Sequence, residues 1–151
     1  MIDTYLDIVH LIERLHRHFL DVLRTELRRI GVADINSVQA LLLYNIGESE
    51  IVIHELKDRG YYYGSNVSYN IKKLTDYGYL NQERSPHDRR ATVLRLTEKG
   101  LALRASVQRL QDHLSNALKS QPGLTSELES ATRSLLHVER TWSEYVRYGR
   151  A

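Results

Sequence analysis

The sequence has no cysteine, only two prolines and a single tryptophan in 151 residues. Without cysteine the chain can form no disulfide and no thiolate metal site, and it cannot sense oxidants through a thiol. No apolar run approaches the roughly 20 residues that a membrane-spanning helix needs, and nothing at the N-terminus resembles a signal peptide. We therefore expect a cytoplasmic protein that forms one compact domain without a membrane segment.

Motifs typical of enzymes are also missing. The sequence contains no phosphate-binding glycine loop, no His-Glu-x-x-His and no Gly-x-Ser-x-Gly. Glu48 and Glu50 lie in a polar linker, where we expect them to be solvated rather than to act as an acid and a base. His10, His16 and His18 do not have the spacing of three or four residues that places two metal ligands on one helical face. We predict no enzymatic activity, no cofactor and no metal site.

Charge is unevenly distributed along the chain, although its net value is only +2. Residues 57–95 hold eight Lys and Arg against four acids, whereas residues 1–56 hold five against nine. Such a local positive excess is the electrostatic signature that binding to phosphates requires, although chance clustering would also produce an excess of this size.

The positive region coincides with a run of short elements. Residues 51–58 fit a short helix, although Ile51, Val52 and Ile53 would equally form a strand. A second helix is predicted at about residues 65–77, closed by Gly78. Two strand-like runs, 80–84 and 92–96, then surround a polar turn. Two helices followed by a basic hairpin are the outline of a winged helix-turn-helix, the fold of many DNA-binding proteins.

The second helix has the side chains expected of a recognition helix. Val67, Ile71 and Leu74 recur at helical spacing and form one apolar stripe. The rest of the helix is polar and suits base edges and phosphates in the major groove. An ordinary solvated helix surface would show the same pattern. The DNA contacts that we predict here are Ser65, Asn66, Ser68, Tyr69, Lys72 and Lys73.

The hairpin at about residues 80–96 is the predicted wing, and its tip is rich in arginine. An arginine on a protruding ribbon reaches the minor groove, where the negative potential favours a guanidinium. Asp88 either holds the guanidinium of Arg90 by a bidentate bond or caps the turn and leaves Arg90 free. The DNA contacts that we predict on the wing are Arg84, Asp88, Arg89 and Arg90.

Long helices are predicted on both sides of this region. The first covers about residues 3–30 and ends at Gly31, and a shorter one at 35–46 is capped by Asn36 or Asp34. After Thr97, a helix runs to the break at Pro122-Gly123, and a capping box at Ser126–Glu129 opens the last helix. The long helices carry more apolar surface than one copy can bury, which favours a helical dimer interface.

The run from Gly64 to Leu80, the Asp88-Arg89-Arg90 triplet and the Leu96-Thr97-Glu98-Lys99-Gly100 motif resemble the MarR family of bacterial transcriptional regulators. The resemblance covers residues 35–100 by motif and the flanking helices by arrangement, and within the family it extends to an LdtR-type branch. It implies a mainly α (α+β) winged helix-turn-helix. Residues 31–100 would form the DNA-binding lobe, and residues 1–30 and 101–151 the dimerisation region.

The resemblance also implies a function. It indicates a homodimer that binds a palindromic operator in double-stranded DNA, and whose affinity is tuned by a small aromatic or amphipathic effector. The residues that we expect around such a ligand are His10, Arg14, Phe19, Tyr44 and Tyr63. The alternative is a winged helix that docks a protein through its hairpin and the tyrosines at 61–63. These tyrosines either pack in the turn or offer a hydroxyl to a phosphate.

Overall fold

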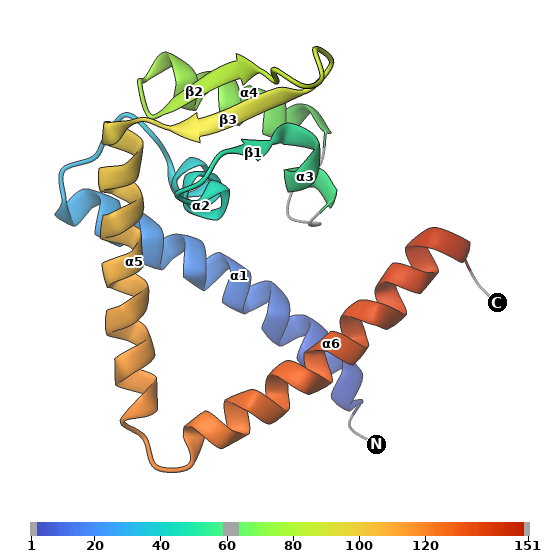
Figure 1. Ribbon diagram of the computed structural model, residues 1–151. Helices are drawn as coiled ribbons and strands as arrows, with labels where there is room; N and C mark the ends of the chain where they lie inside the picture. Colours follow the sequence, from blue (N-terminus) through green and yellow to red (C-terminus); the bar gives the residue numbers. More distant parts are fainter. Residues whose placement is uncertain (1–2, 59–63, 150–151) are drawn as a thin grey trace. The chain divides into compact units, whose positions relative to one another are not determined.

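The computed structural model describes residues 3–58 and 64–149. Its elements in chain order are α1 (Thr4–Arg29), α2 (Ser37–Ile46), β1 (Ile51–Val52), α3 (Ile53–Asp58), α4 (Gly64–Asp76), β2 (Leu80–Arg84), β3 (Thr92–Leu96), α5 (Glu98–Lys119) and α6 (Leu124–Tyr148). The predicted winged helix-turn-helix between long helices is confirmed (Figure 1). The predicted roles of Tyr61, Tyr62 and Tyr63 fall outside the described residues.

Contacts divide the chain into two units, Met1–Leu110 and Gln111–Ala151. The first unit holds the sheet, α1 to α4 and the N-terminal part of α5, and the second holds the end of α5 and α6. No described helix combines the length and hydropathy that a membrane crossing requires.

The sheet is antiparallel, with the strand order β1-β3-β2. Ile51 lies opposite Leu94 on β3, and Leu80 of β2 lies opposite Leu96. The strand and the helix predicted for this stretch both occur, because Ile51 and Val52 form a strand and the helix begins at Ile53. Pairing of β1 with β3 fixes the hairpin to the start of the helix-turn-helix.

The core of the first unit lies where α2 packs against α1, α4 and β3 (Figure 1). Leu42 and Leu43 of α2, Leu74 of α4 and Leu94 of β3 are completely buried there. α2 is apolar on nearly all sides, as a helix in the centre of a small domain must be. Its N-terminus is closed by Asn36, whose side chain forms a reciprocal capping box with Gln39.

α5 begins in close contact with the turn that follows α4. Thr97 caps it as predicted, since its hydroxyl accepts a hydrogen bond from the backbone N–H of Gly100 at 3.2 Å. A Cβ on Gly100 would lie 2.1 Å from the carbonyl oxygen of Tyr79, so no side chain fits at this position. The glycine of the Leu96–Gly100 motif is therefore required by packing.

The second unit contains a helix with no buried residue. α6 starts at Leu124, directly after Gly123, whose φ of +79° reverses the chain and whose position offers no side-chain cap. The predicted capping box at Ser126–Glu129 is wrong, because Ser126 already lies inside the helix. Apolar side chains on α6 remain exposed, namely Leu128, Leu135, Leu136, Trp142, Tyr145, Val146 and Tyr148.

Candidate nucleic-acid interface

α4 presents a polar face because its apolar stripe is anchored in the core. Val67, Ile71 and Leu74 are buried, which turns Asn66, Ser68, Tyr69 and Lys72 towards solvent. Ser65 lies at the start of the helix, and its side chain is outside the described residues. The structure thus brings the other residues predicted on this helix onto one surface, with Lys73 half-buried at its edge.

Two local contacts order the side chains of this face. Lys72 Nζ lies 3.0 Å from the Asp76 carboxylate, and Lys73 Nζ lies 5.7 Å from the ring centre of Tyr69. Both contacts lie at the surface, so each contributes at most about 1 kcal/mol. They leave the cations available to phosphates, which would displace Asp76 from Lys72.

The tip of the wing is shaped by hydrogen bonds from backbone N–H groups to side-chain oxygens. Ser85 Oγ accepts the N–H groups of His87 and Asp88 at 3.2 and 3.3 Å. Asp88 Oδ1 accepts the N–H of Arg90 at 2.9 Å. Of the two roles considered for Asp88, the structure shows the cap, and the bidentate bond to the Arg90 guanidinium is not formed.

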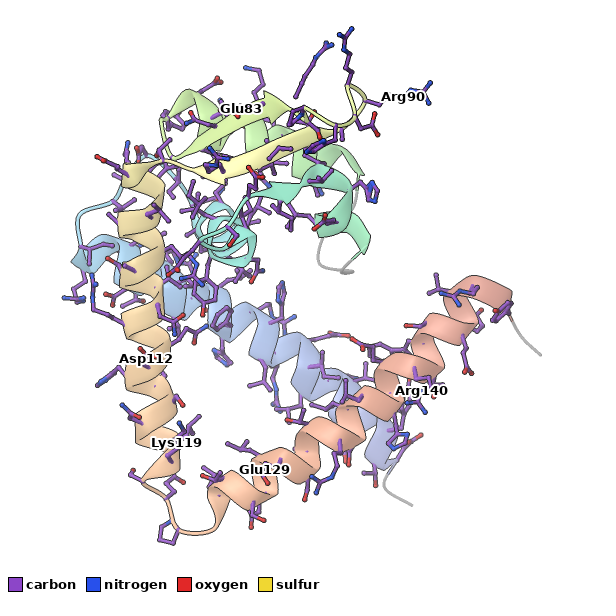
Figure 2. The ribbon with its side chains drawn as sticks, viewed as in Figure 1. Glu83, Arg90, Asp112, Lys119, Glu129 and Arg140 are labelled. Carbon is purple, nitrogen blue, oxygen red and sulfur yellow. The ribbon has the colours of Figure 1, made fainter. Side chains whose placement is uncertain are left out.

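The arginines of the wing are consequently open to solvent. Arg84, Arg89 and Arg90 are all exposed, and the ion pairs of the described residues involve none of them. Figure 2 shows Arg90 pointing away from the sheet at the tip of the hairpin. Arg95 differs, because its guanidinium pairs with Glu50 in the linker before β1.

A hollow of about 300 Å³ lies beside the tip-side end of the wing, and its lining includes Arg90 and Thr92 of the hairpin and His54 of α3. His54 was not among the predicted site residues. His54 lies close to the wing because β1 pairs with β3, and residue spacing in the sequence does not predict that pairing.

The residues predicted around a ligand do not form one site. His10 and Arg14 share a hollow on the surface of α1, whereas Phe19, half-buried further along α1, and Tyr44 of α2 do not line it. The hydroxyl of Tyr44 donates to Gln108 Oε1 at 2.8 Å. Tyr63 lies outside the described residues.

Tyr44 instead belongs to a contact between α2 and α5 that the sequence did not reveal. The guanidinium of Arg104 lies 5.1 Å from the ring centre of Tyr44, and its Nη1 lies 3.2 Å from Glu48. Arg104 Nε is buried, and no described residue accepts its hydrogen. A buried donor without a partner costs free energy, so an acceptor that reached it would be favoured.

A polar cluster lies beside the C-terminal end of α4. Asp34 accepts the hydroxyl of Tyr79 at 2.7 Å and Lys99 Nζ at 3.0 Å. Partial burial opposes ionisation of Asp34, but the hydrogen bonds from Tyr79 and Lys99 outweigh it and lower the pKa of the carboxyl. Burial, together with the hydrogen bond to Asp34, raises the pKa of the Tyr79 hydroxyl.

A buried helix-turn-helix with an exposed polar helix and an arginine-tipped wing defines the class of winged helix DNA-binding proteins. A model of the winged helix DNA-binding domain matches residues 35–100. A relative, the exopolysaccharide II synthesis transcriptional activator ExpG of Rhizobium meliloti, is 39% identical over 146 residues, which cover 97% of this chain and 75% of the relative.

Solved structures with the same fold include FabT of Streptococcus pneumoniae in complex with DNA, with a TM-score of 0.75 and 18% identity over 93% of this chain and 98% of that chain. A MarR regulator of Methanosarcina mazei has a TM-score of 0.71 and 23% identity over 90% and 96% of the two chains. MarR of E. coli in its apo form has a TM-score of 0.63 and 20% identity over 90% and 98%.

The chain belongs to the MarR family of winged helix-turn-helix transcriptional regulators. The predicted membership is confirmed, and with it the prediction of a DNA-binding regulator rather than an enzyme. The LdtR-type branch stays a prediction.

Proposed function

We propose that this protein is a homodimer that reads a palindromic operator, with α4 in the major groove and the wing in the minor groove. The observation that carries the proposal is the pairing, on one lobe, of the polar face of α4 with free arginines at the wing tip. Phosphate contacts by Lys72 and Arg89 would set the register, and base edges would be read by Asn66 and Tyr69. A cytoplasmic location follows from this function.

The exposed apolar surface supports the homodimer. No residue of α6 is buried, and Tyr5, Leu6, Leu11 and Leu15 of α1 are exposed as well. Exposed apolar surface of this extent marks an interface, and a two-fold axis lets identical helices cover one another. Two recognition helices related by that axis would meet successive turns of the duplex. The helical dimerisation region and the DNA-binding lobe are therefore part of the proposal.

We also propose that a small anionic aromatic effector tunes the affinity for DNA. Support comes from Arg104, whose unpaired Nε lies beside the Tyr44 ring between α2 and α5. A carboxylate would accept the Arg104 hydrogen while an aromatic ring stacks on Tyr44. His10 and Arg14 remain candidates for a separate contact on α1. Such a ligand can shift DNA binding only if it binds the free and DNA-bound forms with different affinity.

Selection of bound sequences from random duplex DNA tests the main proposal. We expect a palindrome with half-sites about one helical turn apart, and an affinity that falls steeply as salt is added, because counterions are released from phosphates. Since the relative is named a transcriptional activator, a reporter gene placed behind the selected site should first be tested for activation. Failure to enrich any sequence, with binding that ignores salt, would favour the alternative of a protein-docking module.

A further inference from the structure

The short segment that leads into α2, together with the first turn of α2, contacts α4 through Gln39. Gln39 is the one buried polar residue recorded in the described part of the chain, with 6% of its surface exposed. Its Oε1 accepts the N–H of Asn36, which closes α2, and its Nε2 donates to Asn70 Oδ1 at 3.2 Å. The Gln39 side chain therefore caps the N-terminus of α2 and also forms a hydrogen bond to the middle of α4, the proposed recognition helix.

The same segment also contacts the far end of α4. Asp34 accepts the Tyr79 hydroxyl at 2.7 Å, and Tyr79 lies in the turn that follows the helix. Lys99 reinforces this contact, since its Nζ bonds Asp34 at 3.0 Å and the carbonyl of Tyr77 at 2.9 Å. The Lys99 ammonium also lies 4.2 Å from the ring centre of Tyr79.

These polar contacts fix the orientation of α4, which its apolar face alone cannot do. Burial of Val67, Ile71 and Leu74 holds the helix on the core, but the hydrophobic effect has no direction and tolerates small rotations. Hydrogen bonds weaken steeply when their geometry changes. Two of them, one at the middle and one past the end of α4, therefore fix both the rotation and the tilt of the helix.

We propose that the segment from Asp34 to Gln39 positions the recognition helix for base reading, with Asp34 and Gln39 acting as positioning residues that touch no DNA. The inference rests on the proposed function, because it concerns how α4 meets the major groove. Base contacts depend on geometry to a fraction of an ångström, whereas phosphate contacts by long side chains adapt. Loosening α4 therefore costs preference for the selected sequence more than it costs general affinity.

The test compares affinity for the selected palindrome with affinity for an unrelated duplex of equal length. Tyr79→Phe removes the hydroxyl that Asp34 accepts and keeps the buried ring, and Asn70→Leu removes the oxygen that Gln39 reaches. We expect each variant to lower the ratio of the two affinities roughly three- to tenfold, about the effect of one hydrogen bond, with affinity for the unrelated duplex unchanged. Amide hydrogen exchange in α4 should be faster in both variants without DNA.

Two matched variants separate positioning from stability. Tyr77→Phe removes a neighbouring hydroxyl that makes no recorded hydrogen bond within the described residues, and it should keep the wild-type ratio. Asn70→Asp keeps an oxygen for the Gln39 amide, so its added charge should lower both affinities and preserve their ratio. Thermal unfolding shows that each variant is folded at the assay temperature.

The outcomes are distinct. Unchanged ratios and unchanged exchange in Tyr79→Phe and Asn70→Leu would overturn the inference and leave the proposed function intact, since the wild type still prefers its palindrome. An equal loss on both duplexes would also overturn it, because that result indicates a merely structural role. A wild type without any preference would overturn the proposed function itself.

Discussion

The two units of this chain differ in how far their apolar residues are buried. In the first unit, Leu42, Leu43 and Leu94 are completely buried by α1, α4 and the sheet. In the second, Leu136 is 53% and Val146 81% exposed, and no residue of α6 is buried. α4 of the first unit and α6 of the second are both amphipathic helices, so the difference in burial between them lies in the available partners.

Only one of these two regions is complete as a single copy. The first unit, which carries α4 and the wing, buries its own core and carries the surface proposed for DNA. Burial of the apolar stripe changes along α5, because Leu103 and Val107 are buried whereas Leu118 is exposed. Stability of the lobe should therefore be independent of concentration, and association should depend on the helices.

The largest effect should come from removing core volume in the lobe. Leu43→Ala is expected to lower the free energy of unfolding by about 2–5 kcal/mol, because it leaves a cavity among packed side chains. Leu136→Ala is the matched change on α6 and should leave unfolding of the lobe within about 0.5 kcal/mol while weakening self-association. Denaturant titration followed by circular dichroism measures the unfolding, and sedimentation at two protein concentrations measures the self-association. Equal destabilisation by the two changes would remove the distinction between the units.

A second test concerns the contact that seats α5 on the lobe. Gly100→Ala should lower the free energy of unfolding by about 1–3 kcal/mol, because the new Cβ overlaps the carbonyl of Tyr79 and must push α5 away. Ala102→Ser, an exposed change in the same helical turn, is the control and should be nearly neutral. Wild-type stability of Gly100→Ala would show that α5 is not packed as described.

The DNA surface can be tested with two arginines of the same hairpin. Arg90→Ala should weaken binding to the selected palindrome roughly tenfold and reduce the salt dependence by about one counterion. Arg95→Ala should have a smaller effect, because the Arg95 guanidinium is already paired with Glu50. Fluorescence anisotropy across a salt series measures both quantities. The assignment of the wing would fail if Arg95→Ala were the more damaging change.

The smallest effect is a dependence on pH. The pKa of Asp34 is lowered in the folded state, so its contribution is present above the pKa of the unfolded chain, whose model value is 3.8, and is lost as the pH falls through the folded value. Asp34→Asn should therefore be less stable than the wild type near neutral pH, by less than about 1 kcal/mol because the side chain is partly exposed. The difference should disappear in acid, and denaturant titrations at several pH values would show it. A stability difference between Asp34→Asn and the wild type that stayed constant with pH would contradict a stabilising role for the ionised Asp34 carboxylate.

Local patterns predicted the outline of the lobe. The spacing of Val67, Ile71 and Leu74 indicated α4 and its buried face, and the turn signals around Pro86 indicated the hairpin. Such features depend on residues that are close in sequence, which is why spacing reveals them. The start of α6 was placed too late because the Ser126–Glu129 pattern resembles a cap, while Gly123 had already turned the chain.

Long-range polar contacts could not be predicted in this way. Asp34 and Tyr79 are 45 residues apart, and Gln39 and Asn70 are 31 apart. Their meeting depends on how α2 and α4 pack, which apolar periodicity does not specify. The burial of Arg104 Nε beside Tyr44 likewise depends on where α5 lies on α2.

The most direct test is the mass of the protein on its selected duplex, measured by sedimentation equilibrium. We predict two chains per duplex and, without DNA, a particle of twice the chain mass that dissociates when Leu135, Leu136 and Trp142 are all changed to alanine. A single chain per palindrome, or a free protein that stays a monomer at every concentration, would contradict the account.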